Sequence, residues 1–170
     1  GGYSSRPDAE DIAVEEEWRR VEMALSAVRE VSADVAISID TFRSEIVRRA
    51  NDNFGDIVVN DITAGVGDVE MLRTVAERKL PYIAMHMRGT PQTMQQQTQY
   101  NDVVAEVVAE LQSRLSAIDE AGIERCRVAL DPGFGFAKDV AQNYLLVAGL
   151  ERLNALGCRL LVGISRKSML

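Results

Sequence analysis

The sequence predicts an α/β fold built on a parallel sheet whose strands end at one functional face. Five short apolar runs, at 35–39, 57–59, 82–85, 128–130 and 160–164, are each followed by a polar residue that can bind small molecules. These polar residues are Asp40, Asn60, His86, Asp131 and Ser165. Helical patterns separate the runs, as expected for parallel strands. In barrels and open α/β sheets alike, the carboxyl ends of such strands carry the chemistry.

The first half of the chain predicts three helices around the first three strands. Apolar residues recur at spacings of four and three in a first helix that begins near Pro7: Val14, Trp18, Val21, Leu25 and Val28. Shorter helices are predicted at 43–51 and 69–78. The strands between them are almost uniformly apolar, which is typical of strands buried on both faces.

The second half predicts one long loop, two further helices and the start of another. A helix at 104–118 ends at Gly122, and a single helix at 140–156 ends at Gly157. The polar stretch 87–99 follows a strand on the proposed functional face, where long loops serve as lids or binding segments. The alternative is a disordered insert without function. A last helix begins at Ser165.

Composition excludes several classes of protein. The chain has 170 residues, of which 46% are hydrophobic and 26% charged, as in an ordinary globular domain. The net charge of -7 disfavours nucleic acid and anionic membranes as partners, and no run approaches the roughly 20 apolar residues of a membrane span. Cys126 and Cys158 are too distant in sequence for a C-x-x-C site, so we expect reduced thiols and a cytoplasmic protein.

Both ends of the sequence predict a domain that continues beyond it. The chain opens on loop residues and closes where a helix should begin. A complete eight-stranded α/β barrel needs about 250 residues. We therefore expect residues 1–170 to form a single domain that is truncated at both ends.

The polar residues at the strand ends predict a pocket for a polar bicyclic ring. Carboxylates at Asp40 and Asp131 can accept paired hydrogen bonds from an amidine-like edge, and Asn60 can donate and accept at once. Lys167 supplies a cation for a carbonyl oxygen or ring nitrogen. The alternative is that each Asp merely caps the next helix.

Other residues of this face could bind a ligand or could have a structural role. Phe134 and Phe136, in a glycine-rich turn, could stack on a flat ligand or fill the mouth of the sheet. His86 is the single histidine and has no suitable nucleophile or ligand set nearby in sequence, so we expect a structural role. Free N–H groups where the last helix begins favour a carboxylate or phosphate, and Ser5–Arg6 form a second candidate anion site.

Six segments together resemble dihydropteroate synthase. They are Ser-Ser-Arg-Pro at 4–7, Ser-Ile-Asp-Thr at 38–41, Val-Asn-Asp-Ile at 59–62, Met-His-Met-Arg-Gly at 85–89, Asp-Pro-Gly-Phe-Gly-Phe at 131–136 and Gly-Ile-Ser-Arg-Lys-Ser at 163–168. The resemblance covers the whole chain. Asn-Asp-Ile alone is a weak signal, whereas the last two segments in one chain are a strong one.

The resemblance implies a TIM (β/α)8 barrel, here incomplete, with about five of its parallel strands present. It implies a transferase of folate biosynthesis that joins p-aminobenzoate to 6-hydroxymethyl-7,8-dihydropterin pyrophosphate, giving 7,8-dihydropteroate and pyrophosphate. It further implies Mg²⁺ on the leaving group, inhibition by sulfonamides, a cytoplasmic location and a homodimer for the complete enzyme.

The resemblance also implies the roles of individual residues. Asp40 and Lys167 would be catalytic and would contact the pterin. The other pterin-binding residues would be Asn60, Ile62, Met85, Asp131 and Gly163. The p-aminobenzoate site and the loop that closes over it would comprise Ser5, Arg6, Pro7, Phe136 and Ser165.

Some features depart from the pattern of that family. Position 5 is Ser rather than the usual Thr, and Tyr3 and Asp8 replace the usual Glu and Gly. The family's first strand, whose Asn helps to place magnesium, and its last strand, whose Arg and His bind an anion, lie outside this sequence. We therefore expect no metal ligands within the chain and no turnover by the chain alone.

Two alternatives remain open. A methyltetrahydrofolate–corrinoid methyltransferase shares the Asp and Asn contacts to pterin, but it should lack the Ser-Arg-Lys-Ser segment that is present here. Alternatively, the chain is a non-catalytic module that binds pterin weakly or not at all.

Overall fold

A five-stranded parallel sheet forms the centre of the computed structural model, which describes residues 12–165. The strands are β1 (Ser38–Asp40), β2 (Val58–Asp61), β3 (Tyr82–Met85), β4 (Val128–Asp131) and β5 (Arg159–Leu160). They lie in the order β1-β2-β3-β4-β5, and each pairs in parallel with the next. This confirms the α/β class and the five parallel strands of the sequence analysis.

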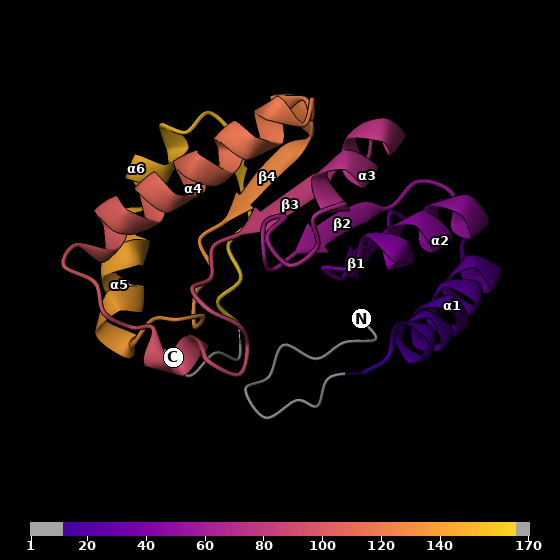
Figure 1. The fold of residues 1–170 in the computed structure, drawn as a ribbon, viewed down its shortest axis with the longest axis horizontal. Coiled ribbons are helices and arrows are strands. Elements are labelled where there is room, and N and C mark those ends of the chain that lie inside the picture. The colour runs from indigo at the N-terminus through magenta and orange to yellow at the C-terminus, as the bar shows by residue number, and fades with distance from the viewer. Residues whose placement is uncertain (1–11, 166–170) are drawn as a thin grey trace.

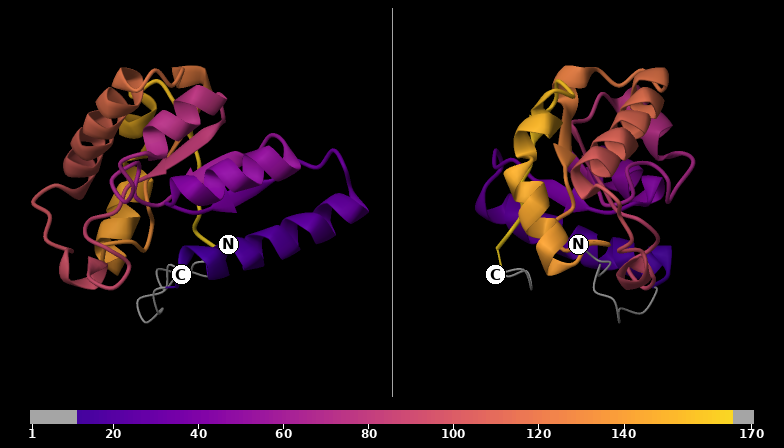
Figure 2. Two further views of the ribbon diagram at one scale, coloured as in Figure 1. Left: turned by 45° about the vertical axis from the view of Figure 1, so that its right-hand side comes forward. Right: turned by 90° about the vertical axis from the view of Figure 1, so that its left-hand side faces the viewer.

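Helices cover one face of the sheet and follow each other in an arc around it (Figure 1). They are α1 (Val14–Val31), α2 (Ser44–Phe54), α3 (Met71–Arg78), α4 (Val103–Glu120), α5 (Val140–Ala148) and α6 (Leu150–Asn154). Short 3₁₀ turns lie at Met94–Gln96 and Arg125–Arg127. The side views in Figure 2 show α1 and α2 at one end of the arc and α4, α5 and α6 at the other.

The core lies between the sheet and these helices. Val59, Tyr82, Ala84 and Leu130 point to the helical side and are fully buried. The opposite, inner face is more open along β1 and β2, where Ser38 and Asp40 are exposed and Val58 and Asn60 are half-buried. Side chains of a strand alternate between the two faces, so every second residue reaches this inner face.

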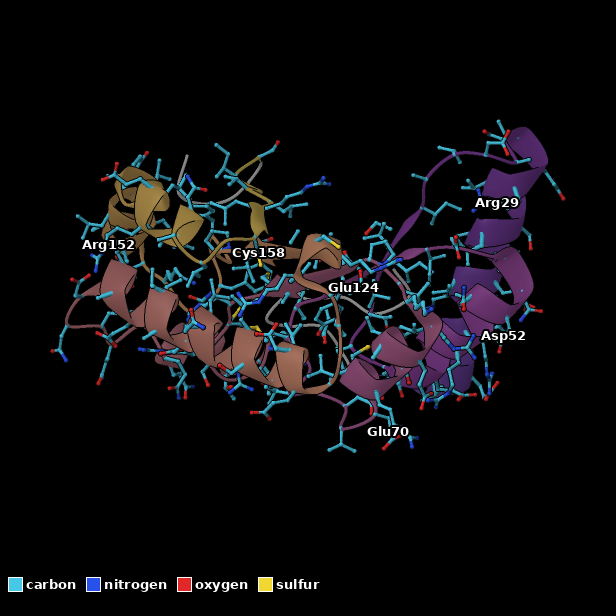
Figure 3. The ribbon with its side chains drawn as sticks, turned by 90° about the horizontal axis from the view of Figure 1, so that it is seen from above. Arg29, Asp52, Glu70, Glu124, Arg152 and Cys158 are labelled. Atoms are coloured by element: carbon cyan, nitrogen blue, oxygen red, sulfur yellow. The ribbon has the colours of Figure 1, made fainter. Side chains whose placement is uncertain are left out.

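Charged side chains lie on the solvent side of the helices. In Figure 3, Asp52 of α2 and Arg152 of α6 lie at opposite ends of the helical layer, and both are exposed. Asp52 pairs with Arg78 of α3 at 2.6 Å, which joins neighbouring helices across the surface. None of the helices between residues 12 and 165 is both long and apolar enough to cross a membrane.

Three predicted boundaries were wrong. The first helix begins at Val14 rather than near Pro7, a position outside the described residues. The last strand, expected at 160–164, comprises only Arg159–Leu160, because it lies at the sheet edge and pairs with β4 alone among the described strands. The first strand was expected at 35–39 but consists of Ser38–Asp40.

The expected single helix at 140–156 is broken at Gly149 into α5 and α6. A Cβ atom on Gly149 would lie 2.6 Å from Val104 Cγ1 of α4, so the chain lies close against α4 where it bends. Asp139 and Gln142 form a capping box that fixes the start of α5. Close packing between helices therefore overrides the continuous amphipathic pattern.

Candidate functional site

The inner face of the sheet brings four predicted residues to its carboxyl edge. Asp40 pairs in register with Asn60, and Asn60 Nδ2 donates a hydrogen bond to Asp40 Oδ1. On the same face of the sheet, Met85 of β3 pairs with Asp131 of the adjacent strand β4. Asp131 and Met85 are buried, whereas Asp40 is exposed. The sheet therefore places two carboxylates and an amide along one surface, as the strand-end pattern predicted.

The neighbouring Asp61 has a structural role instead. Its side chain points to the helical face and is fully buried. Its carboxylate accepts hydrogen bonds from the N–H groups of Thr63 and Gly65 at 2.7 and 2.8 Å and from the Tyr82 hydroxyl at 2.8 Å. Asp61 thus stabilises the turn after β2. It does not cap the next helix, since α3 begins only at Met71.

A buried ion pair fixes the turn that follows Asp40. Glu17 of α1 is fully buried and accepts hydrogen bonds from Thr41 Oγ1 at 2.7 Å and from Arg43 Nη1 at 2.9 Å. The backbone N–H of Thr41 donates to the Asn60 carbonyl at 3.2 Å. Because α1 anchors this turn, the position of Asp40 depends on a helix that precedes it in sequence.

The turn after β4 has a conformation that glycine alone adopts readily. Gly133 has a φ of 68° and its N–H donates to Asp131 Oδ1 at 2.7 Å. A Cβ atom there would lie only 1.9 Å from the His86 carbonyl oxygen. In the same turn Phe134 is fully buried in the core, whereas Phe136 is half-buried. Phe134 therefore fills space, and Phe136 remains accessible to a ligand.

His86 belongs to a network of polar side chains behind this turn. Its Nδ1 lies 3.0 Å from Lys138 Nζ, and its Nε2 lies 2.9 Å from Glu110 Oε2. Arg88 donates to Glu106 at 2.8 Å and to Glu110 at 2.9 Å, and its guanidinium stacks 3.9 Å from the centre of the Tyr100 ring. The structural role expected for His86 is consistent with these contacts.

This network shifts the protonation of its members. Burial lowers the pKa of His86 below its ordinary value of 6.5. The hydrogen bond from His86, assisted by Arg88, lowers the pKa of Glu110 to about 2. At neutral pH the pair is therefore a neutral imidazole beside a carboxylate. Because the Lys138 ammonium can only donate, His86 Nδ1 accepts and Nε2 carries the proton.

The long loop after β3 is structured and borders a cavity. Arg88 Nη1 donates to the Gln99 carbonyl at 2.8 Å, which joins the two ends of the loop, and Gln142 of α5 donates to the Thr98 carbonyl. These contacts connect the loop to its own two ends and to α5. A cavity of about 760 Å³ opens beside this loop. It is lined by Phe42, Arg43, Thr63, Val66, Gly67, Met87, Gly89, Thr90, Pro91 and Gln92.

The cavity lies next to the predicted residues without containing them. It opens among the loops that follow β1, β2 and β3, at the same edge of the sheet as Asp40 and Asn60. Its volume lies within the range of about 300–1,000 Å³ that is usual for small-molecule sites. It therefore extends the candidate site from the inner face towards the loops.

Of the remaining predicted residues, some lie near the carboxyl edge of the sheet and others lie outside the described residues. Ile62 lies half-buried in the turn after β2, Gly163 is half-buried beyond β5, and Ser165 is exposed. Four others lie outside the described residues: Ser5, Arg6, Pro7 and Lys167. Sequence reasoning did not single out Lys138, Glu110 or Glu17. For Lys138 the available signal was its position shortly after the glycine-rich turn.

No metal centre is evident among the described residues. Between residues 12 and 165, no three His, Cys, Asp or Glu side chains lie close enough together to hold a metal ion. Magnesium consequently remains an expectation that the resemblance implies. Cys126 and Cys158 are both free thiols, and only Cys126 is fully exposed.

Comparison with known proteins identifies similar chains over the entire length. The family profile described as "Pterin binding enzyme" matches residues 1–170. Dihydropteroate synthase of Escherichia coli K12 is 40% identical over 170 residues, covering 100% of this chain and 59% of that protein. The dihydropteroate synthase of Synechocystis is 41% identical, with 58% of its length covered.

Solved structures agree with the sequence comparison. Dihydropteroate synthase of Yersinia pestis in a sulfonamide drug complex superposes with a TM-score of 0.92 at 36% identity, covering 99% of this chain and 60% of that one. The Xanthomonas albilineans enzyme with 4-aminobenzoic acid gives a TM-score of 0.88 at 41% identity, with coverages of 99% and 59%. The chain thus spans about three fifths of these relatives, and its fold corresponds to part of a barrel.

Proposed function

The chain belongs to the family of pterin binding enzymes, and from this premise we propose that it is the pterin-binding part of a dihydropteroate synthase. The observation that carries the proposal is the placement of Asp40, Asn60 and Asp131 on one inner face at the strand ends. The proposed reaction joins p-aminobenzoate to 6-hydroxymethyl-7,8-dihydropterin pyrophosphate and releases pyrophosphate.

The three residues suit the edge of a pterin. Asp131 is a buried carboxylate whose orientation is fixed by the Gly133 N–H, so it can accept hydrogen bonds from the amino-pyrimidinone edge. Asn60 is half-buried and already donates to Asp40, which leaves its carbonyl oxygen for ring N–H groups. Ile62, Met85 and Gly163 are proposed as the walls of this pocket, and Lys167 as a contact to the ring carbonyl.

Charge stabilisation explains the proposed catalytic role of Asp40. When pyrophosphate leaves, positive charge develops on the exocyclic carbon and spreads into the dihydropterin ring. A carboxylate fixed near the ring nitrogens stabilises that charge without reorganising. The neutral amine of p-aminobenzoate then attacks the exocyclic carbon, and it loses one N–H proton to solvent as the new C–N bond forms. Lys167 is proposed as the second catalytic residue.

The second substrate is proposed to bind towards the loops. Phe136 is half-buried and would line the slot for the arylamine, and Ser165 would receive the carboxylate. Ser5, Arg6 and Pro7 are proposed to close over this slot and the pyrophosphate. Sulfonamides, which resemble p-aminobenzoate, would occupy the same slot.

Three further features are proposed on the resemblance. Mg²⁺ is the proposed cofactor, but the described residues offer no cluster for it, so no step above is assigned to the ion. The complete enzyme is proposed to be a homodimer. A cytoplasmic location is supported by the two free thiols, Cys126 and Cys158.

The direct test is calorimetric titration of this chain with dihydropterin pyrophosphate. We expect binding by the unmodified chain and none by Asp131→Asn, because the amide donates where the pterin edge also donates. The control is Asp139→Asn, an exposed helix-capping residue outside the proposed pocket, which should bind normally. Equal binding by the Asp131 variant and the unmodified chain would contradict the proposal, as would no binding by either.

A further inference from the structure

Lys138 is a buried cation that does not belong to the proposed ligand contacts. Lys138 is only 5% exposed. Its ammonium donates hydrogen bonds to the carbonyl oxygens of Gly133 at 3.0 Å and Phe136 at 2.9 Å, and to His86 Nδ1 at 3.0 Å. An ammonium has three N–H donors, and three of its acceptors lie among the described residues. Such burial is costly for a lysine, so these contacts offset a large desolvation penalty.

The two carbonyls held by Lys138 delimit the turn that orients Asp131. The Gly133 N–H donates to Asp131 Oδ1 at 2.7 Å, and the Phe136 N–H donates to the Gly133 carbonyl at 3.0 Å. The backbone N–H of His86 donates to the Asp131 carbonyl at 2.9 Å. His86 therefore holds the backbone of Asp131 itself, and Lys138 holds the turn that follows it.

His86 is itself held in one orientation and one tautomer. Glu110 of α4 accepts the proton of Nε2 at 2.9 Å, and Arg88 holds Glu110 from the other side. This leaves Nδ1 as an acceptor aimed at Lys138. The series Arg88, Glu110, His86 and Lys138 thus connects the loop after β3 and helix α4 to the turn after β4.

We propose that Lys138 is a positioning residue for the pterin site. Together with His86, it holds the Gly133–Phe136 turn in place, and this turn keeps the Asp131 carboxylate in its orientation. The inference rests on the proposed function only for the identity of the ligand. Lys138 acts through Asp131 and makes no contact with the substrate.

Nuclear magnetic resonance tests the arrangement without any ligand. The chain contains one histidine, so its imidazole nitrogens give unambiguous signals. We expect a protonated Nε2 and an acceptor Nδ1 in the unmodified chain. In Lys138→Met, the Nδ1 signal should move to that of an unbonded nitrogen, and the Gly133 amide should exchange with solvent at least tenfold faster. Unchanged signals in both places would overturn the proposal.

Pterin binding provides the second readout. Lys138→Met should weaken the binding of dihydropterin pyrophosphate at least tenfold. The matched control is Lys79→Met, an exposed lysine after α3, which should leave binding unchanged. If the unmodified chain does not bind the pterin, the proposed function fails, and the resonance measurements alone decide the positioning role.

A measurement on the unmodified chain covers the case in which Lys138→Met does not fold. Protonating His86 turns its Nδ1 from acceptor to donor and places a second cation beside Lys138. Among the described residues, the other charged groups that act on the imidazole are Glu110 of α4 and Arg88 of its own loop. Arg114 of α4 lines the same small pocket as His86, and the Tyr100 ring lies 6.5 Å from the imidazole. The Gly133 amide and the His86 ring should titrate with a shared midpoint. A Gly133 amide that ignores the protonation of His86 would overturn the proposal.

Discussion

At the scale of single residues, Gly133 shows how closely the turn after β4 approaches β3. Its φ of 68° is unfavourable for residues with a Cβ, and the added atom would lie 1.9 Å from a backbone oxygen. A clash with backbone cannot be relieved by a change of rotamer. The turn must move instead, and the carboxylate of Asp131 moves with it.

We therefore expect Gly133→Ala to lower the free energy of unfolding by about 3 kcal/mol, combining strain and displacement. Gly122→Ala is the control, since Gly122 has a φ of 85° but no atom within 4 Å of its Cβ position. That variant should lose about 1 kcal/mol from backbone strain alone. Urea denaturation measures both. Equal losses would show that the contact with His86 is unimportant for stability.

The residue scale also separates what the sequence could predict about the site from what it could not. Asp40, Asn60 and Asp131 were found because polar residues at the ends of apolar runs mark the carboxyl edge of a parallel sheet. Lys138 was not found, since two of its acceptors are backbone carbonyls whose positions depend on the fold. Glu17 was missed because its partners follow it by 24 and 26 residues.

At the scale of elements, helix packing decides where the chain departs from its hydrophobic pattern. The apolar periodicity of 140–156 continues through Gly149, so the pattern alone predicts one helix. The break between α5 and α6 falls where Gly149 lies against Val104 of α4, a residue 45 positions earlier. In the same way, the pattern located β5, but its short length reflects the absence of a second partner strand among the described residues.

This contact predicts the effect of adding a methyl group at the break. Gly149 has a φ of -96°, which any residue can adopt, so Gly149→Ala introduces no backbone strain. Its Cβ would lie 2.6 and 2.8 Å from the two methyl groups of Val104, which is buried. We expect a loss of about 2 kcal/mol in stability from overpacking between α4 and α5.

Thermal denaturation of Gly149→Ala checks this expectation. Gly163→Ala serves as control, because the Cβ position of Gly163 has no atom within 4 Å and its φ lies outside the left-handed region. The control should change stability by less than about 0.5 kcal/mol. If a second change, Val104→Ala, removes the penalty at Gly149, the loss comes from this contact. A penalty that persists in the double variant would contradict the explanation.

At the scale of the whole molecule, buried and paired ionisable groups determine how stability depends on pH. Burial lowers the pKa of His86 below 6.5, so the folded chain binds this proton more weakly than the unfolded chain. Acid therefore favours unfolding as the pH falls from about 6.5. Glu110 acts at lower pH: its pKa of about 2, against an ordinary 4.5, means that its contribution is present above 4.5 and lost towards 2.

Both groups act in the same direction, which predicts two successive losses of stability on acidification. The urea midpoint should fall between pH 7 and pH 5 as His86 resists protonation, and fall again below pH 4.5 as carboxylates such as Glu110 are protonated. His86→Gln removes the first titrating group, so this variant should lose the upper slope. The lower slope should remain but become shallower, because Arg88 still pairs with Glu110 while the hydrogen bond from His86, the largest cause of its lowered pKa, is gone. If the urea midpoint falls equally steeply between pH 7 and pH 5 in both proteins, His86 is not the group responsible.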